Sequence, residues 1–173
     1  MGSTPSSAEM VARGALLSSL ALLFSYVEAM IPFVPQIPGI KLGLANIVVI
    51  IALYRYSART ALVVNLVRIF LAGFLFSGVF GILYSASGAL LSLLVMTLLK
   101  KSGRFHLISV SMAGGVFHNV GQLIVASLLV GTSGILSYLP VLWFIGMGMG
   151  SLVGVLDSLI LTRLPRGNTA ANG

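Results

Sequence analysis

Long apolar runs make up most of the chain, and short segments containing charge, proline or glycine separate them. A helix needs roughly 20 mainly apolar residues to cross a hydrocarbon core about 30 Å thick. The pattern therefore predicts an all-α, polytopic membrane protein with six transmembrane helices. The runs cover residues 10–31, 41–54, 58–77, 79–99, 107–130 and 138–162. Because the second run is short for a full crossing, we expect a tilted, partly buried helix there.

The basic residues predict how the helices are oriented. Eight of the ten Lys and Arg residues flank the runs on one side, namely Arg13, Arg55, Arg59, Lys100, Lys101, Arg104, Arg163 and Arg166. Lys41 stands alone on the other side. The positive-inside rule then predicts that both termini are cytoplasmic, as six crossings require. We expect one transmembrane domain over residues 10–163, with cytoplasmic tails at 1–9 and 164–173.

Composition excludes several classes of function. Of the 173 residues, 58% are hydrophobic and 8% are charged, against about 25% charged residues in a soluble domain. The net charge of +7 does not predict a nucleic-acid partner, because the basic residues lie at the ends of apolar runs. The absence of cysteine excludes thiol catalysis and cysteine metal sites, and two histidines leave little for a metal. We predict no catalytic residue, no metal and no directly bound cofactor.

Polar residues inside the apolar runs are the candidates for function, since such residues face the protein interior, a partner or a water-filled cavity. They are Glu28, Asn46, Asn65, Arg68, His118, Asn119, Gln122 and Asp157. Arg68 and His118 each lie about 15 Å into their runs at 1.5 Å per residue, so we expect them at one level. Asp157 lies near the cytoplasmic end of its run, and we expect it to pair with Arg163 or another base there.

Two interpretations of the mid-membrane cluster remain open. In one, Arg68 forms a structural ion pair with Glu28, and a backbone carbonyl satisfies His118. In the other, Arg68 and its amide and imidazole neighbours receive a ligand that is anionic or rich in acceptors. A guanidinium suits carboxylate or phosphate, because it donates two parallel hydrogen bonds. The apolar surroundings would hold the rest of such a ligand.

Small residues at helical spacing predict where helices pack closely, since lipid provides little drive for apolar burial. Two such sets are expected to pack within the bundle: Gly146, Gly150 and Gly154, and Gly81, Ser85 and Ala89. A third set follows one face of the first helix from its cytoplasmic end and is a candidate docking face for a partner protein: Ala8, Ala12, Ala15 and Ser19.

The segment after the first run is rich in proline, which stiffens it and removes backbone donors. Pro32, Pro35 and Pro38 all lie in the eight residues 32–39. The segment either covers the mouth of a pocket or forms a plain turn packed on helix ends.

Three stretches carry a resemblance to a known family. Residues 28–56 include P-G-I-K-L-G-L-A-N, residues 83–92 read L-Y-S-A-S-G-A-L-L-S, and residues 115–122 include F-H-N-V-G-Q. Over roughly residues 10–160 the chain resembles the bacterial membrane proteins known as Gx transporters or heptaprenyl diphosphate synthase component I. The resemblance implies a multi-pass protein of the bacterial cytoplasmic membrane. With Tyr84, in the second stretch, the candidate substrate-binding residues are Glu28, Asn46, Asn65, Arg68, Tyr84, His118, Asn119 and Gln122.

That family is in turn similar to the substrate-binding S components of energy-coupling factor transporters. The similarity implies that the small-residue face of the first helix docks on a coupling module, made of a transmembrane coupling subunit and two ATPases that use ATP. It also implies that the first extracytoplasmic loop closes the site. The candidate lid residues are then Pro32, Pro35, Pro38, Gly39 and Lys41.

The enzyme name of the family does not fit these residues. Prenyl diphosphate synthases bind diphosphate through magnesium held by clustered aspartates, and this chain has one Asp and two Glu. It also lacks the G-x-x-x-x-G-K-[ST] motif of ATPases. We expect a non-enzymatic S component. The alternatives are a non-catalytic membrane subunit associated with heptaprenyl diphosphate synthesis or precursor handling, and a secondary transporter coupled to protons through Glu28 and His118.

Overall fold

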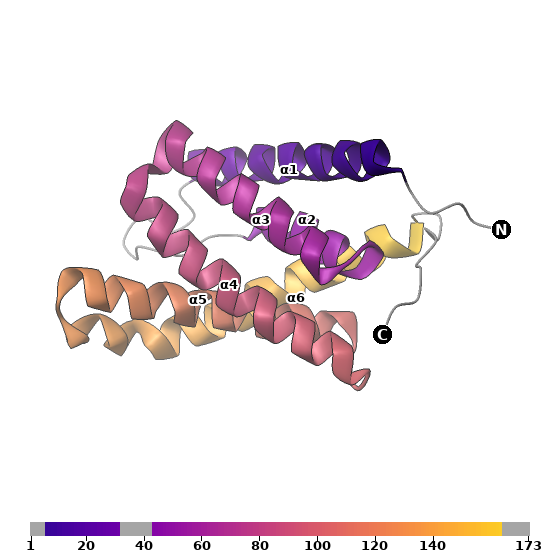
Figure 1. Cartoon of the computed structure of the whole chain (residues 1–173). Helices are drawn as coiled ribbons and strands as arrows, with labels where there is room; N and C mark the ends of the chain where they lie inside the picture. Colours follow the sequence, from indigo (N-terminus) through magenta and orange to yellow (C-terminus); the bar gives the residue numbers. More distant parts are fainter. Residues whose placement is uncertain (1–5, 32–42, 164–173) are drawn as a thin grey trace.

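The computed structural model describes residues 6–31 and 43–163, and their regular structure is entirely helical (Figure 1). This confirms the all-α class. The elements are α1 (Ser7–Met30), α2 (Leu44–Arg55), α3 (Ala58–Ala72), the π-helix η1 (Gly73–Ser77), α4 (Gly78–Ser102), α5 (Leu107–Val130), the 3-10 helix η2 (Ser133–Tyr138) and α6 (Leu139–Arg163).

Four helical stretches are long and apolar enough to cross a membrane, namely residues 7–30, 58–102, 107–130 and 133–163. The second stretch contains α3, η1 and α4, and the chain reverses its direction within it, near Gly78 (Figure 1). Gly78 adopts φ 69°, which glycine reaches without a steric penalty. The chain is thus a membrane-embedded helical bundle, whereas the count of six crossings and the cytoplasmic placement of the termini stay predictions.

Helix α1 begins three residues before the predicted start of the first run. Ser6 accepts a hydrogen bond of 3.2 Å from the backbone N–H of Glu9, and the Glu9 carboxylate accepts one of 3.1 Å from the N–H of Ser6. This reciprocal pair is a capping box, which satisfies two backbone donors that a helix start otherwise leaves open. Hydropathy alone did not reveal this boundary because the capping residues are polar.

The short helix α2 is buried more completely than predicted. Seven of its twelve residues are buried: Ala45, Ile47, Val48, Val49, Ile50, Ala52 and Leu53. The Lys100 ammonium donates a hydrogen bond of 2.6 Å to the carbonyl oxygen of Leu53 near the end of α2, where a cation complements the helix dipole. Other helices enclose α2, so its lack of full membrane length does not expose backbone polar groups to lipid.

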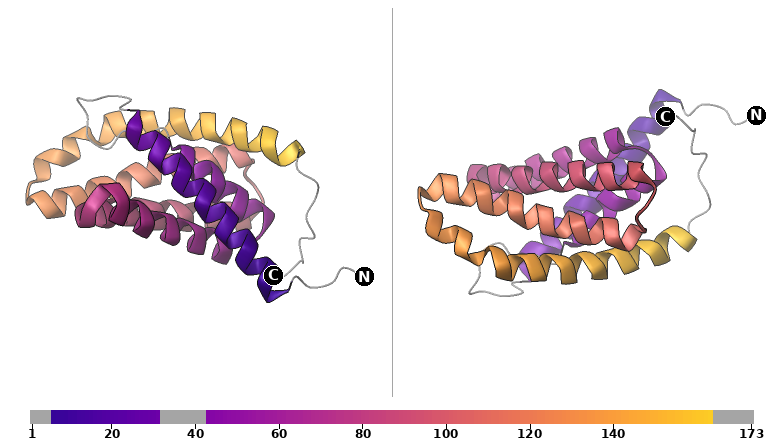
Figure 2. Two further views of the ribbon diagram at one scale, coloured as in Figure 1. Left: turned by 90° about the horizontal axis from the view of Figure 1, so that it is seen from above. Right: turned by 90° about the horizontal axis from the view of Figure 1, so that it is seen from below.

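The predicted glycine seam of α6 packs against α5, and the two helices run side by side in opposite directions (Figure 2). A Cβ on Gly150 would lie 2.7 Å from the carbonyl oxygen of Ser111, and one on Gly146 would lie 2.9 Å from that of Gly115. The Ser111 hydroxyl donates a buried hydrogen bond of 2.7 Å to the carbonyl oxygen of Gly150. Glycine is therefore required for the close approach of these two helices.

The seam predicted on α4 is displaced to a neighbouring face. A Cβ on Gly81 would meet only Ser77, whereas one on Gly88 would lie 2.6 Å from the carbonyl oxygen of His118 on α5. A Cβ on Gly121 of α5 would lie 2.7 Å from the carbonyl oxygen of Ser87. Of the predicted set, Ala89 is buried and Ser85 lines a pocket. The α4–α5 contact therefore runs through Gly88 and Gly121.

The prediction that Asp157 pairs with Arg163 is wrong, and no other base among the described residues takes its place. Asp157 is fully buried, and within the described residues neither carboxylate oxygen has a hydrogen-bond partner. Arg163 is exposed. The two residues are six positions apart in α6, which places them on different faces of the helix, so charge proximity along the chain does not become contact.

The helices pack in a continuous bundle. Helix α1 packs on α2 and α3, α3 also contacts α4, and α5 packs on both α4 and α6. The start of α1 and the end of α6 lie at the same end of the molecule, and the connections between η1 and α4 and between α5 and α6 lie at the other (Figures 1 and 2).

Candidate substrate-binding site

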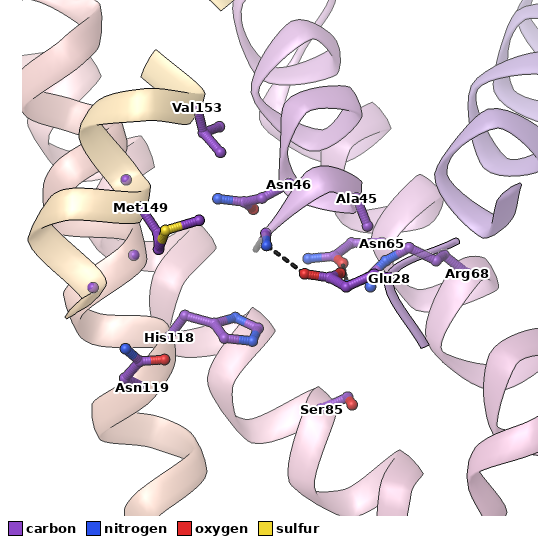
Figure 3. A pocket seen from close by; sticks show the side chains of 14 residues that line it. Glu28, Ala45, Asn46, Asn65, Arg68, Ser85, His118, Asn119, Met149 and Val153 are labelled. Carbon is purple, nitrogen blue, oxygen red and sulfur yellow. Dashed lines mark hydrogen bonds between the residues drawn. The ribbon is translucent and has the colours of Figure 1, made fainter. Parts of the chain in front are cut away.

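A polar pocket lies inside the bundle, where side chains and backbone from α1 to α6 converge (Figure 3). Its cavity measures about 60 Å³, several times the space that one water molecule needs. The lining residues are Glu28, Gly43, Ala45, Asn46, Asn65, Arg68, Ser85, Gly115, His118, Asn119, Gly146, Met149, Gly150 and Val153. A cavity of this size suits a small polar group of a ligand.

The cationic wall of the pocket is built around Arg68. Its Nη2 donates a hydrogen bond of 2.6 Å to the side-chain oxygen of Asn65, and its Nη1 donates one of 3.1 Å to the hydroxyl of Ser25. Its Nε is buried and has no hydrogen-bond partner among the described residues. Two neutral residues thus hold the guanidinium in place, and neither neutralises its charge.

Glu28 supplies the opposite charge, and it also joins two helices. Its carboxylate accepts a hydrogen bond from the backbone N–H of Gly43, the residue that precedes α2 (Figure 3). A carboxylate at this position complements the positive end of the α2 dipole. The charge of Glu28 also attracts that of Arg68. Glu28 therefore has a structural task that is independent of any ligand.

The facing wall comes from α5 and α6. His118 and Asn119 lie across the hollow from Glu28, Asn65 and Arg68 (Figure 3). The Asn119 amide donates a hydrogen bond of 2.8 Å to the carbonyl oxygen of Leu142 on α6, so its orientation is fixed. The glycine backbones of the α5–α6 seam complete this wall. Arg68 and His118, from two different helices, thus face one cavity.

The structure places six of the eight predicted substrate-binding residues in the wall of this pocket: Glu28, Asn46, Asn65, Arg68, His118 and Asn119. Gln122 is 2% exposed and lies between α5 and α4, where its Cγ would be 2.7 Å from a Cβ on Gly88. Tyr84 lines a separate apolar groove on the outside of α4. The structure does not bring these two side chains into the polar pocket.

Two other sets of residues were predicted, the lid residues and the docking residues, and the structure describes only the second. The lid residues Pro32, Pro35, Pro38, Gly39 and Lys41 lie outside the described residues. The docking residues of α1, which are Ala8, Ala12, Ala15 and Ser19, are all exposed. The buried residues of α1 are Ser18, Ala21 and Ser25. The small-residue face of α1 therefore points away from the bundle.

Sequence reasoning missed several contributors to the site, and three of them are polar or large side chains. Ser25 holds Arg68, and Ser85 and Met149 line the pocket. Ser25 lies three residues before Glu28, and this spacing places both on one face of α1. That spacing was a usable signal for Ser25. Met149 was not distinguishable from the surrounding apolar residues.

Comparisons with known proteins give a family for the chain. Residues 17–160 match the family model described as heptaprenyl diphosphate synthase component I. Neither the curated proteins nor the solved structures include a match to this chain. The match spans most of the described bundle and includes every residue of the polar pocket. The chain therefore belongs to the heptaprenyl diphosphate synthase component I family.

Proposed function

We propose that this protein is the substrate-binding S component of an importer of the energy-coupling factor type. It captures an anionic or amphipathic small molecule from outside the cell and docks on a separate coupling module, made of a transmembrane subunit and two ATPases. The observation that carries this proposal is the cavity between Arg68 and His118. There a guanidinium that donates to Ser25 and Asn65, with the Glu28 carboxylate also in the wall, faces an imidazole inside an apolar bundle.

The chemistry of the pocket favours an anion. Arg68 has five N–H donors, and two of its nitrogens are engaged by Ser25 and Asn65. A carboxylate or phosphate in the cavity would gain charge-assisted hydrogen bonds from the remaining donors. Asn46 and Asn119 on the surrounding walls would add neutral polar contacts. Such a site can bind and orient an anionic ligand.

The outer face of α1 supports the docking part of the proposal. Four small residues at helical spacing are exposed there, so the backbone of a partner helix has room to approach closely. The sequence contains no ATP-binding motif of the G-x-x-x-x-G-K-[ST] type. Energy for import would then come from the partner ATPases.

Two measurements test this function. The protein is co-expressed with a coupling module from a bacterium that carries this family, and we expect the two to co-purify. Mass spectrometry of small molecules that survive purification should identify an anion that Arg68→Gln no longer retains. Absence of both the complex and a retained anion would overturn the proposal.

The family description supports a second candidate, a non-catalytic membrane subunit beside a soluble prenyl diphosphate synthase. Arg68 and His118 would then hold a diphosphate group. This candidate predicts that adding the protein in liposomes raises the chain-elongation rate of the soluble partner, and that Arg68→Gln abolishes the increase. An unchanged rate would eliminate it.

A further inference from the structure

A second hollow adjoins the polar pocket on the other side of Arg68. It is lined by α1, α3, η1 and α4, and it shares Glu28, Arg68 and Ser85 with the first. Its remaining lining residues are Ser25, Ala29, Ile69, Ala72, Gly73, Phe76, Ser77 and Gly81. The Arg68 side chain therefore stands between two hollows and contributes to the walls of both.

The π-helix η1 shapes this second hollow. The wider turn of a π-helix shifts the residues that follow it and occurs often at functional sites. Here η1 contributes Gly73, Phe76 and Ser77 to the wall. A Cβ on Gly73 would clash with the side chain of Ile82, so the start of α4 packs directly on the η1 backbone. The hollow is thus built by a specific distortion of the chain.

A third hollow, an open apolar groove of about 500 Å³, follows on the outside of the bundle between α4 and α5. Its lining residues are Phe80, Gly81, Tyr84, Ala126, Leu129 and Val130. Gly81 lines both this groove and the second hollow. The groove is lined by the start of α4 and the end of α5, and these two segments lie at the end of the bundle opposite the start of α1 (Figure 1). In the predicted orientation, this is the outer leaflet.

The three hollows adjoin one another, because each shares at least one lining residue with the next. From this arrangement we infer that the ligand is an amphiphile with an anionic head held by Arg68 and a hydrocarbon tail that lies in the groove between α4 and α5. Access is then sideways, from the outer leaflet through the second hollow. This inference rests on the proposed function and narrows its substrate class. The occupant of the groove is the tail of the captured ligand, because the groove adjoins a cavity with an orienting cation.

The energetics identify which part of the ligand provides specificity. A tail that moves from the bilayer into a groove facing the bilayer gains little hydrophobic free energy, since both surroundings are apolar. The charge-assisted hydrogen bonds to Arg68 must therefore hold the ligand. Bulk lipid in the groove would not depend on Arg68, whereas the tail of a captured amphiphile would.

This difference is the basis of the experiment. The full-length protein in nanodiscs is incubated with dodecyl phosphate that carries a diazirine at the end of its tail, irradiated, digested and analysed by mass spectrometry. We expect cross-links in the segments 80–84 and 126–130. Arg68→Gln should reduce them at least about tenfold, as loss of a charge-assisted hydrogen bond implies. A choline-headed analogue with the same tail should give labelling that does not change with Arg68.

Two further variants control for the position of the tail. Ala126→Phe fills the groove and should abolish labelling there, while Ser109→Phe adds the same side chain to an exposed position of α5 and should leave it unchanged. Equal labelling of wild type and Arg68→Gln would overturn the inference, because bulk lipid would then be the occupant. Circular dichroism and size-exclusion profiles confirm that each variant is folded.

Failure of the inference is distinguishable from failure of the proposed function. Ethyl phosphate has the head but no long tail, and its binding is measured separately by equilibrium dialysis. Binding of ethyl phosphate that depends on Arg68, with tail labelling elsewhere, would refute the groove and keep the anion site. No binding of either phosphate would refute both the tail groove and the anion site at Arg68.

Discussion

The Arg68 guanidinium donates a hydrogen bond of 2.6 Å to the side-chain oxygen of Asn65, which lies three residues earlier on α3. Asn65 is 4% exposed, so water does not readily replace this bond. The pair fixes the cation at the boundary between two hollows. Removing the Asn65 acceptor should therefore lower the free energy of unfolding by a measurable amount.

Asn65→Leu should lower the free energy of unfolding by about 1–3 kcal/mol, because a charged donor loses its buried acceptor. Thermal unfolding in detergent micelles measures the change. In the background of Arg68→Met, the same substitution should cost much less, since the two residues act as a pair. Equal costs in both backgrounds would show that the hydrogen bond contributes nothing specific.

Glu28→Gln separates the two tasks of that carboxylate. Glutamine keeps an oxygen that can accept from the backbone N–H of Gly43, but it removes the negative charge that acts on Arg68. We expect anions to bind more tightly, because a competing charge is gone. Equilibrium dialysis with ethyl phosphate checks this. Unchanged anion binding together with reduced thermal stability would favour a purely structural ion pair.

The α5–α6 seam predicts a contrast between two glycines of α6. Gly150→Ala places a Cβ about 2.7 Å from the carbonyl oxygen of Ser111, so the helices must separate. The expected cost is about 1–3 kcal/mol, as for other overpacked positions. Gly148 is exposed, and a Cβ added there would have no atom within 4 Å, so Gly148→Ala should be neutral or slightly stabilising. Thermal unfolding of both variants is the measurement.

The outer face of α1 predicts a loss of partner binding without a loss of fold. Ala12→Leu adds bulk to an exposed position and should leave the unfolding temperature unchanged. Co-purification with a coupling module should fall, because close helix approach needs small residues. Ser109→Leu, an exposed change on α5, is the matched control. If both variants retained the module equally, another face of the protein would have to make the contact.

Asp157→Asn tests a buried carboxylate without a hydrogen-bond partner among the described residues. The amide has almost the same shape and carries no charge, and burying an unpaired charge is costly. We expect the unfolding temperature at pH 8 to stay equal or to rise. A fall of several degrees would show that the charge of Asp157 is compensated by a group outside the described residues.

Local patterns along the chain were enough to predict the class of this protein and most of its polar centre. Long apolar runs have few stable arrangements besides membrane helices, and an internal Arg or Asn must face the interior or a cavity. The break near Gly78 and the α6 glycine seam also followed from spacing alone. Each of these depends on residues within a few positions of one another.

Which polar residues meet was settled by the packing of the helices in three dimensions. Gln122 shares a helix face with His118 but lies against Gly88 outside the polar pocket, and Tyr84 faces an apolar groove. The packing seam of α4 runs through Gly88 and not through Gly81, and Asp157 forms no hydrogen bond with Arg163. These outcomes depend on the rotation of each helix about its axis and on the angles at which the helices cross. Contacts between residues that are distant in sequence determine both. Hydropathy along the chain carries no information on that rotation.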